Sequence, residues 1–162
     1  MATPAWELID SNTLSSSASS VTFSAIPQGY RDLVLIVDLD GIAMDALGIR
    51  FNGDTGSNYT DVKMRGNGST TQSATQTDSY IEIGINTAGE SGKRLYVTNI
   101  MDYSATDKHK SVLSRGNSSG NVVALAGRWA NTSAITSLSV IEAFSAGFTA
   151  GDTFYLWGLN RL

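Results

Sequence analysis

Short runs of β-branched and aromatic residues, separated by clusters of Gly, Ser, Asn and Asp, recur along the whole chain. Ser20 to Ala25 alternates between polar and apolar residues, which is typical of a strand with one buried face. Leu33 to Val37 is apolar at every position and predicts a strand that is buried on both faces. Helical periodicity is weak, and Gly41 to Leu47 is the best candidate for a single helical turn. The pattern therefore predicts an all-β protein.

We expect about nine or ten strands, in an antiparallel β-sandwich of jelly-roll type with little or no helix. The clearest expected strands are residues 20–25, 32–39, 48–51, 80–85, 94–100, 111–114, 122–125, 137–144 and 153–158. Asn52-Gly53 and Asn67-Gly68 mark tight turns, because Asn-Gly tolerates positive φ. The polar stretch Gly66 to Ser79 is interpreted as a long loop, which is often functional. We expect one domain over residues 1–162, with an N-terminal arm of about 18 residues and a short C-terminal tail.

The composition favours a protein that contacts protein or sugar surfaces. The chain has 162 residues, enough to bury a core, but only 16% of them are charged. Ser, Thr, Asn and Gly take the place of charged residues on the surface. The net charge is -4, and the densest basic stretch, Lys108 to Lys110, is not interleaved with aromatic residues. Nucleic acid is therefore not expected as a partner.

The chain has no cysteine, which excludes disulfides and thiolate metal sites. Residues 1–6 have neither a basic start nor an apolar run, so we do not expect a signal peptide there. The longest apolar stretch, around Leu33 to Val37, is much shorter than a membrane span. These features predict a soluble protein that is made in the cytoplasm and has no membrane partner.

Signatures of catalysis are scarce. His109 is the only histidine, and its charged neighbours predict a place in a solvated loop. No G-x-S-x-G elbow, Walker A loop or dinucleotide fingerprint occurs, so neither a nucleophile nor a cofactor is expected. We therefore expect that the protein is not an enzyme.

Two acidic patterns have simpler explanations than chemistry. Asp38, Asp40, Asp54 and Glu82 are the carboxylates from which a glycosidase pair would come. Asp38 and Asp40 share one face of a strand near its end, where a strand turning into solvent explains them better. Asn52 to Asn58 resembles an oxygen-rich calcium loop but lacks the closing acidic residue, and a turn explains it equally well.

The aromatic side chains are the better candidates for contacts with a partner. Trp6, Trp129, Tyr155 and Trp157 can fill the core, anchor a protein interface or stack on sugar rings. Tyr155 and Trp157 share one face of the expected final strand, which is apolar on both faces and so lies centrally or against a neighbouring subunit. Together with Leu162 in the tail, these four residues are the candidate interface.

Several ordered motifs can be read together. Trp6 to Ile9 opens the chain, and Val21 to Pro27 is followed by Tyr30 to Leu33. Arg50 to Asp54 comes next, and the chain closes on Phe148 to Gly158. This series resembles the small β-sandwich virion proteins of tailed bacteriophages, over nearly the whole chain.

The resemblance implies a structural protein of the virion without catalytic residues. Such domains occur as capsid decoration (cement) proteins and in tail fibres or spikes. A cement protein, expected as a homotrimer, would bind copies of itself and the major capsid protein on the capsid surface. The alternative is a receptor-binding module that recognises host surface glycan, with the stretch Gly66 to Ser79 and exposed aromatic residues as its site. The absence of a coiled coil or a repetitive shaft in this chain favours the capsid.

Overall fold

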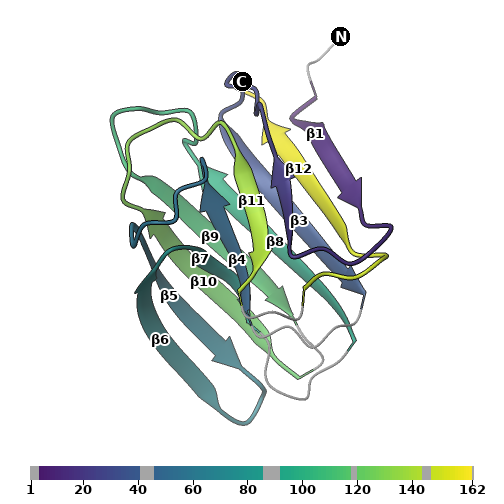
Figure 1. Ribbon diagram of the computed structural model, residues 1–162. Helices are drawn as coiled ribbons and strands as arrows, with labels where there is room; N and C mark the ends of the chain where they lie inside the picture. Colours follow the sequence, from purple (N-terminus) through teal and green to yellow (C-terminus); the bar gives the residue numbers. More distant parts are fainter. Residues whose placement is uncertain (1–3, 41–45, 86–91, 118–119, 144–146, 162) are drawn as a thin grey trace.

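The computed structural model describes residues 4–40, 46–85, 92–117, 120–143 and 147–161. Within these ranges the only regular elements are β-strands. Twelve strands form two antiparallel sheets that pack face to face (Figure 1). The prediction of an all-β antiparallel sandwich is confirmed. No helix long and apolar enough to cross a membrane occurs in the described part of the chain.

The larger sheet has eight strands, and neighbours in it often come from distant parts of the chain. In spatial order they are β1 (Trp6–Thr13), β12 (Thr153–Leu159), β3 (Asp32–Asp40), β8 (Lys93–Met101), β9 (Lys110–Asn117), β10 (Val122–Trp129), β5 (Tyr59–Gly66) and β6 (Thr71–Asp78). The smaller sheet consists of β2 (Ser20–Phe23), β11 (Leu138–Glu142), β4 (Ala46–Phe51) and β7 (Ile81–Ile85). Figure 1 is viewed with the four-stranded sheet in front.

The hydrophobic core lies between the two sheets. Alternating residues of each strand point into it, as in β12, where Phe154 and Leu156 are fully buried. The prediction for the run Leu33 to Val37 is confirmed, because β3 is central and only Ile36 in this run is partly exposed. Trp129 has the largest of the fully buried side chains and packs against Phe51 and Tyr59.

Three strands were not expected, and this explains why the count exceeds nine or ten. They are β1, β5 and β6. The expectation of a long loop over Gly66 to Ser79 is wrong, because a short turn at Asn67 to Thr70 joins β5 to β6. In that turn the Asn67 side-chain oxygen accepts hydrogen bonds from the backbone N–H groups of Ser69 and Thr70. The sequence pattern did not predict this hairpin, because β6 is exposed on both faces and its side chains are polar.

The chain ends also differ from expectation. Residues 6–13 form an edge strand paired with β12, so the segment expected as a free arm is largely part of the sheet. Leu159 ends β12, and the following residue, Asn160, hydrogen-bonds to the backbone oxygens of Pro4 and Ala5. Asn160 thus ties the end of β12 to the chain's own N-terminal segment. Of the expected helical turn, residues 41–45 lie outside the described residues, and Ala46 and Leu47 begin β4.

Candidate binding face

The four-stranded sheet covers one face of the eight-stranded sheet, and no described strand covers the opposite, outer face, on which only the central Val34 is buried by its neighbours. Every large hydrophobic side chain that is exposed in the described residues lies on this outer face. They are Trp6, Leu8, Val62, Met64, Leu95, Met101, Leu113 and Val122, each between 41% and 66% exposed. Their places follow from alternation, because their neighbours in each strand point into the core.

On the outer face, residues that lie opposite each other on neighbouring strands form rows across the sheet. Two adjacent rows consist mainly of apolar side chains. The first row crosses seven strands without a gap: Leu8, Trp157, Val34, Asn99, Leu113, Ala126 and Val62. The second row runs beside it: Tyr155, Ile36, Val97, Arg115, Ala124 and Met64. We call these two rows the outer band. At about 4.8 Å between strands, the first row is roughly 29 Å long.

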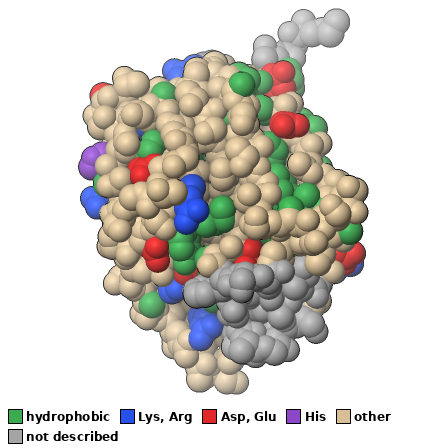
Figure 2. Space-filling model, viewed as in Figure 1, with side chains coloured by type: hydrophobic (Ala, Val, Ile, Leu, Met, Phe, Trp, Pro, Cys, Tyr) green, Lys and Arg blue, Asp and Glu red, His purple; other side chains and the backbone are tan. Residues whose placement is uncertain are grey.

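The band is apolar except at two positions near its centre, and it becomes polar where it reaches β6. Asn99 and Arg115 are its two polar residues, and both lie in the middle strands. On β6 the two rows end at Thr75 and Ser73. The opposite side of the molecule differs: Figure 2 shows mostly polar side chains and backbone there, with hydrophobic side chains in scattered groups. The two faces of the sandwich are therefore chemically distinct.

Two hollows lie at the ends of the outer face. Trp6, Ile36 and Trp157 line one of about 250 Å³. The other, of about 470 Å³, lies at the far end of the sheet, where Met64 and Val122 belong to its lining. Both hollows therefore place apolar side chains beside open space, as the recesses of a docking surface do.

Three of the five interface candidates fall on this outer face. Trp6 is 47% exposed, and Tyr155 and Trp157 are half-buried on β12. The expectation that Trp129 lies at an interface is wrong, because it is 1% exposed and fills the core. Leu162 lies outside the described residues.

The buried Trp129 is tied to the loop that resembles a calcium site. Its indole Nε1 donates a hydrogen bond to Asp54 Oδ2 at 2.8 Å. Asp54 also accepts from the Asn58 side chain and from the Gly56 backbone N–H. The hydrogen bond from Trp129 is the main cause that lowers the pKa of the Asp54 carboxyl. The turn explanation accounts for all these contacts.

The remaining carboxylates singled out in the sequence are not brought together. Asp38 and Asp40 are exposed at the end of β3, where Asp40 pairs with Lys93 at 3.1 Å. Asp54 lies in the loop after β4, and Glu82 lies on β7. Among the described residues no group of three or more His, Asp or Glu side chains is placed to hold a metal ion.

A buried polar cluster was not expected from the sequence. Glu82 forms an ion pair with Lys63, and its backbone N–H donates to Asp61 Oδ2 at 3.1 Å. Gln76 of β6 donates to the same Asp61 oxygen at 3.0 Å. Burial raises the pKa of both Asp61 and Glu82. The cluster therefore fastens β6 and β7 to β5.

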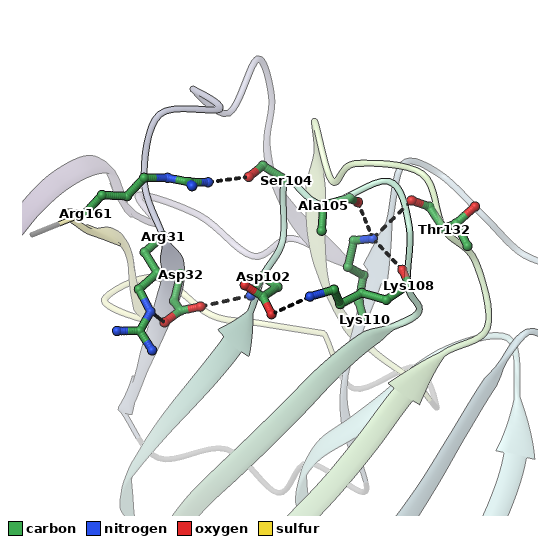
Figure 3. Close-up of polar contacts among 9 residues, drawn as sticks. All are labelled: Arg31, Asp32, Asp102, Ser104, Ala105, Lys108, Lys110, Thr132 and Arg161. Atoms are coloured by element: carbon green, nitrogen blue, oxygen red, sulfur yellow. Dashed lines mark hydrogen bonds and ion pairs between the residues drawn. The ribbon is translucent and has the colours of Figure 1, made fainter.

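The basic stretch Lys108 to Lys110 does not form a basic patch. Lys110 is fully buried, and its Nζ donates to the backbone oxygens of Ala105, Lys108 and Thr132 at 2.7, 3.0 and 3.2 Å (Figure 3). Lys108 pairs with Asp102 at 3.2 Å, and His109 is exposed as expected. Burial lowers the pKa of Lys110. This stretch therefore holds two loops together at one end of the sandwich.

Comparison with known proteins finds similarity only to solved structures, at low sequence identity and low TM-score. No family model and no curated protein sequence matches the chain. The galectin LEC-6 of Caenorhabditis elegans is 9% identical, with 93% of this chain and 96% of the galectin covered and a TM-score of 0.36. The alginate lyase Aly36B is 15% identical, with 82% and 70% covered and a TM-score of 0.33. The exo-inulinase of Aspergillus awamori is 12% identical, with 95% of this chain but 29% of the inulinase covered and a TM-score of 0.37.

Proposed function

We propose that this protein is a structural protein of a bacteriophage virion, a capsid decoration protein that docks on the major capsid protein through its outer band. The observation that carries the proposal is the row of outward-facing side chains from Leu8 on β1 to Val62 on β5, which is apolar on six of its seven strands and polar only at Asn99. The motifs at both ends of the chain, which resemble those of small phage virion proteins, give the partner class.

The outer band has the chemistry of a protein interface. Leu113 near its centre is 47% exposed and Met64 is 58% exposed, so much of their apolar surface is in water. Large contiguous apolar surfaces of this kind mark interaction sites in soluble proteins. Each Å² of apolar area that a partner covers stabilises the complex by about 25 cal/mol before the costs of association. A band that crosses seven of the eight strands therefore suits a partner with an extended surface.

A glycan-binding fibre module is the second candidate, and the hollow at Trp6 and Trp157 favours it. Indole rings beside open space stack well on sugar rings. However, the third residue that lines this hollow is Ile36, so the indole N–H groups are the only side-chain hydrogen-bonding groups of the lining and no side chain there accepts a hydrogen bond from a sugar hydroxyl. In the first row, the aliphatic side chains of Leu113 and Val34 lie on either side of Asn99. This chemistry favours protein over carbohydrate, and it supports a binding role without catalysis.

The proposal is tested by adding purified protein to phage heads assembled without it and counting the bound copies. Leu113→Glu places a charge at the centre of the outer band and should lower the affinity at least about tenfold, as loss of an interface hot spot does. Thr22→Glu is the matched control, because Thr22 is an exposed strand residue of the other sheet. Circular dichroism should show both variants folded. Binding of Leu113→Glu at wild-type affinity would contradict docking through the band.

A further inference from the structure

The eight-stranded sheet has two edges, and only one of them is protected against pairing. The β1 edge has an irregular register between Leu8 and Asp10, and it carries the acidic side chains of Glu7 and Asp10. Bulges and charges are the usual devices that keep an edge strand from pairing with another chain. The β6 edge, in contrast, has neither device between Thr71 and Thr77.

Strand β6 is long, regular and exposed. Its eight residues pair with β5 without interruption, from Thr71 opposite Gly66 to Asp78 opposite Tyr59. The sequence TQSATQTD has no Gly, no Pro and no basic residue, and its only charge is at the last position. Its outer edge therefore offers a row of backbone N–H and C=O groups to another strand.

The sequence of β6 is nearly palindromic about Ala74. An antiparallel pairing of two copies about a two-fold axis at Ala74 matches like with like. The opposed residues are Thr71 with Thr77, Gln72 with Gln76, and Ser73 with Thr75. Neutral polar residues thus face each other on both sides of the axis, where Ala74 faces its own copy, and Thr–Thr and Thr–Ser pairs stabilise antiparallel strands. A strand of another sequence would not be matched in this way.

We propose that β6 pairs with β6 of a second copy of this chain, which makes the two large sheets one continuous sheet across a two-fold axis. The inner side chains of β6 are already held for this pairing. Gln72 accepts a hydrogen bond from Arg65 Nε at 2.6 Å, and Gln76 donates to Asp61. The hairpin is thereby fastened in the extended form that pairing needs, and little further ordering is required.

The pairing has two consequences for the assembly. It brings the outer bands of the two copies toward one continuous surface, since Val62 and Met64 are the band residues next to β6. It also gives dimers, where the resemblance to virion proteins implies a homotrimer. Pairing of one strand buries less area than a standard interface, so we expect a dimer that depends on concentration. This inference does not depend on the proposed function.

The test is sedimentation of the full chain over a concentration series, with a charge introduced on the axis. Ala74→Glu places two carboxylates opposite each other across the axis and should raise the dimer dissociation constant at least about tenfold. Within one copy the new side chain has room, because Ala74 is exposed. Ser11→Glu, on the β1 edge, is the matched control and should sediment as the wild type does.

Two further measurements fix the register. Mixing Ala74→Glu with Ala74→Lys should restore a dimer, because opposite charges then face each other. Since the chain has no cysteine, Ala74→Cys should give a single oxidised cross-link between copies, whereas Ser11→Cys should not. A wild-type protein that stays monomeric or forms trimers would overturn the inference. A dimer that Ala74→Glu leaves unchanged would also overturn it.

Discussion

The indole Nε1 of Trp129 lies 2.8 Å from Asp54 Oδ2, so the largest side chain of the core uses its one polar atom to hold a surface turn. Trp129→Phe keeps an aromatic ring in the core but removes this donor. We expect a loss of about 1–3 kcal/mol in the free energy of unfolding, measured by urea denaturation. Trp129→Ala should lose about 3–5 kcal/mol, because it also opens a cavity.

The same variant should change the dependence of stability on acid. The pKa of Asp54 is lowered in the folded protein, so its stabilisation is present above the ordinary carboxyl pKa and is lost as the pH falls through the folded value. Without the Trp129 donor, the pKa of Asp54 should rise toward its ordinary value. Carboxyl chemical shifts followed by NMR during an acid titration measure this, and an unchanged Asp54 titration would contradict the assigned cause.

Two buried tyrosines predict a loss of stability in strong alkali. Burial raises the pKa of Tyr59 and of Tyr80 from 10.0 to about 12. Between these values the folded state holds more protons than the unfolded state, so stability should fall as the pH rises through this window. Tyr80→Phe should make this fall shallower. Denaturation at several alkaline pH values tests it, and an equal slope in both proteins would argue against burial as the cause.

Lys110 should be needed for the loops that it joins. Lys110→Met keeps the buried hydrocarbon but leaves the carbonyl oxygens of Ala105, Lys108 and Thr132 without their donor. We expect a loss of about 2–3 kcal/mol, the value typical of hydrogen bonds to a charged group. Lys108→Met is the control, because its ion pair with Asp102 is exposed and worth less than about 1 kcal/mol. Equal stability of the two variants would contradict this.

Trp157 should matter more for binding than for folding. It lies half-buried on the outer face, opposite Leu8 and Val34, and not in the core. Trp157→Ala should therefore cost about 1–2 kcal/mol in thermal or urea denaturation, less than a core truncation. Under the proposed function, the affinity of Trp157→Ala for phage heads should fall at least about tenfold. A folded Trp157→Ala variant that binds like the wild type would place the contact elsewhere on the molecule.

The strands that build the core were predictable from the sequence, because their apolar residues follow the period of a buried strand. The run Leu33 to Val37 and the alternation of Phe154 and Leu156 are examples. Strand β6 was not predictable in this way, since Thr, Gln and Ser carry no hydrophobic period. Its pairing with β5 is set by the turn at Asn67 and by the contacts of Gln72 and Gln76.

The outer band was only partly predictable. Tyr155 and Trp157 were expected to share a face of the last strand, and they do. The alternation within β8 and β9 also marks Leu95 and Leu113 as outward-facing residues. However, the rows depend on the register of strands that are far apart in the chain, such as β1 with β12. Local patterns contain no information on that register, and the band therefore emerges only in the folded protein.

The most direct test of docking through the outer band is an electron cryomicroscopy reconstruction of the virion to which the proposed function assigns this protein. We expect copies on the head, with the outer face of the eight-stranded sheet, including Leu113 and Trp157, against the major capsid protein. Copies confined to the tail tip, or copies on the head whose outer band faces solvent, would contradict the proposed function.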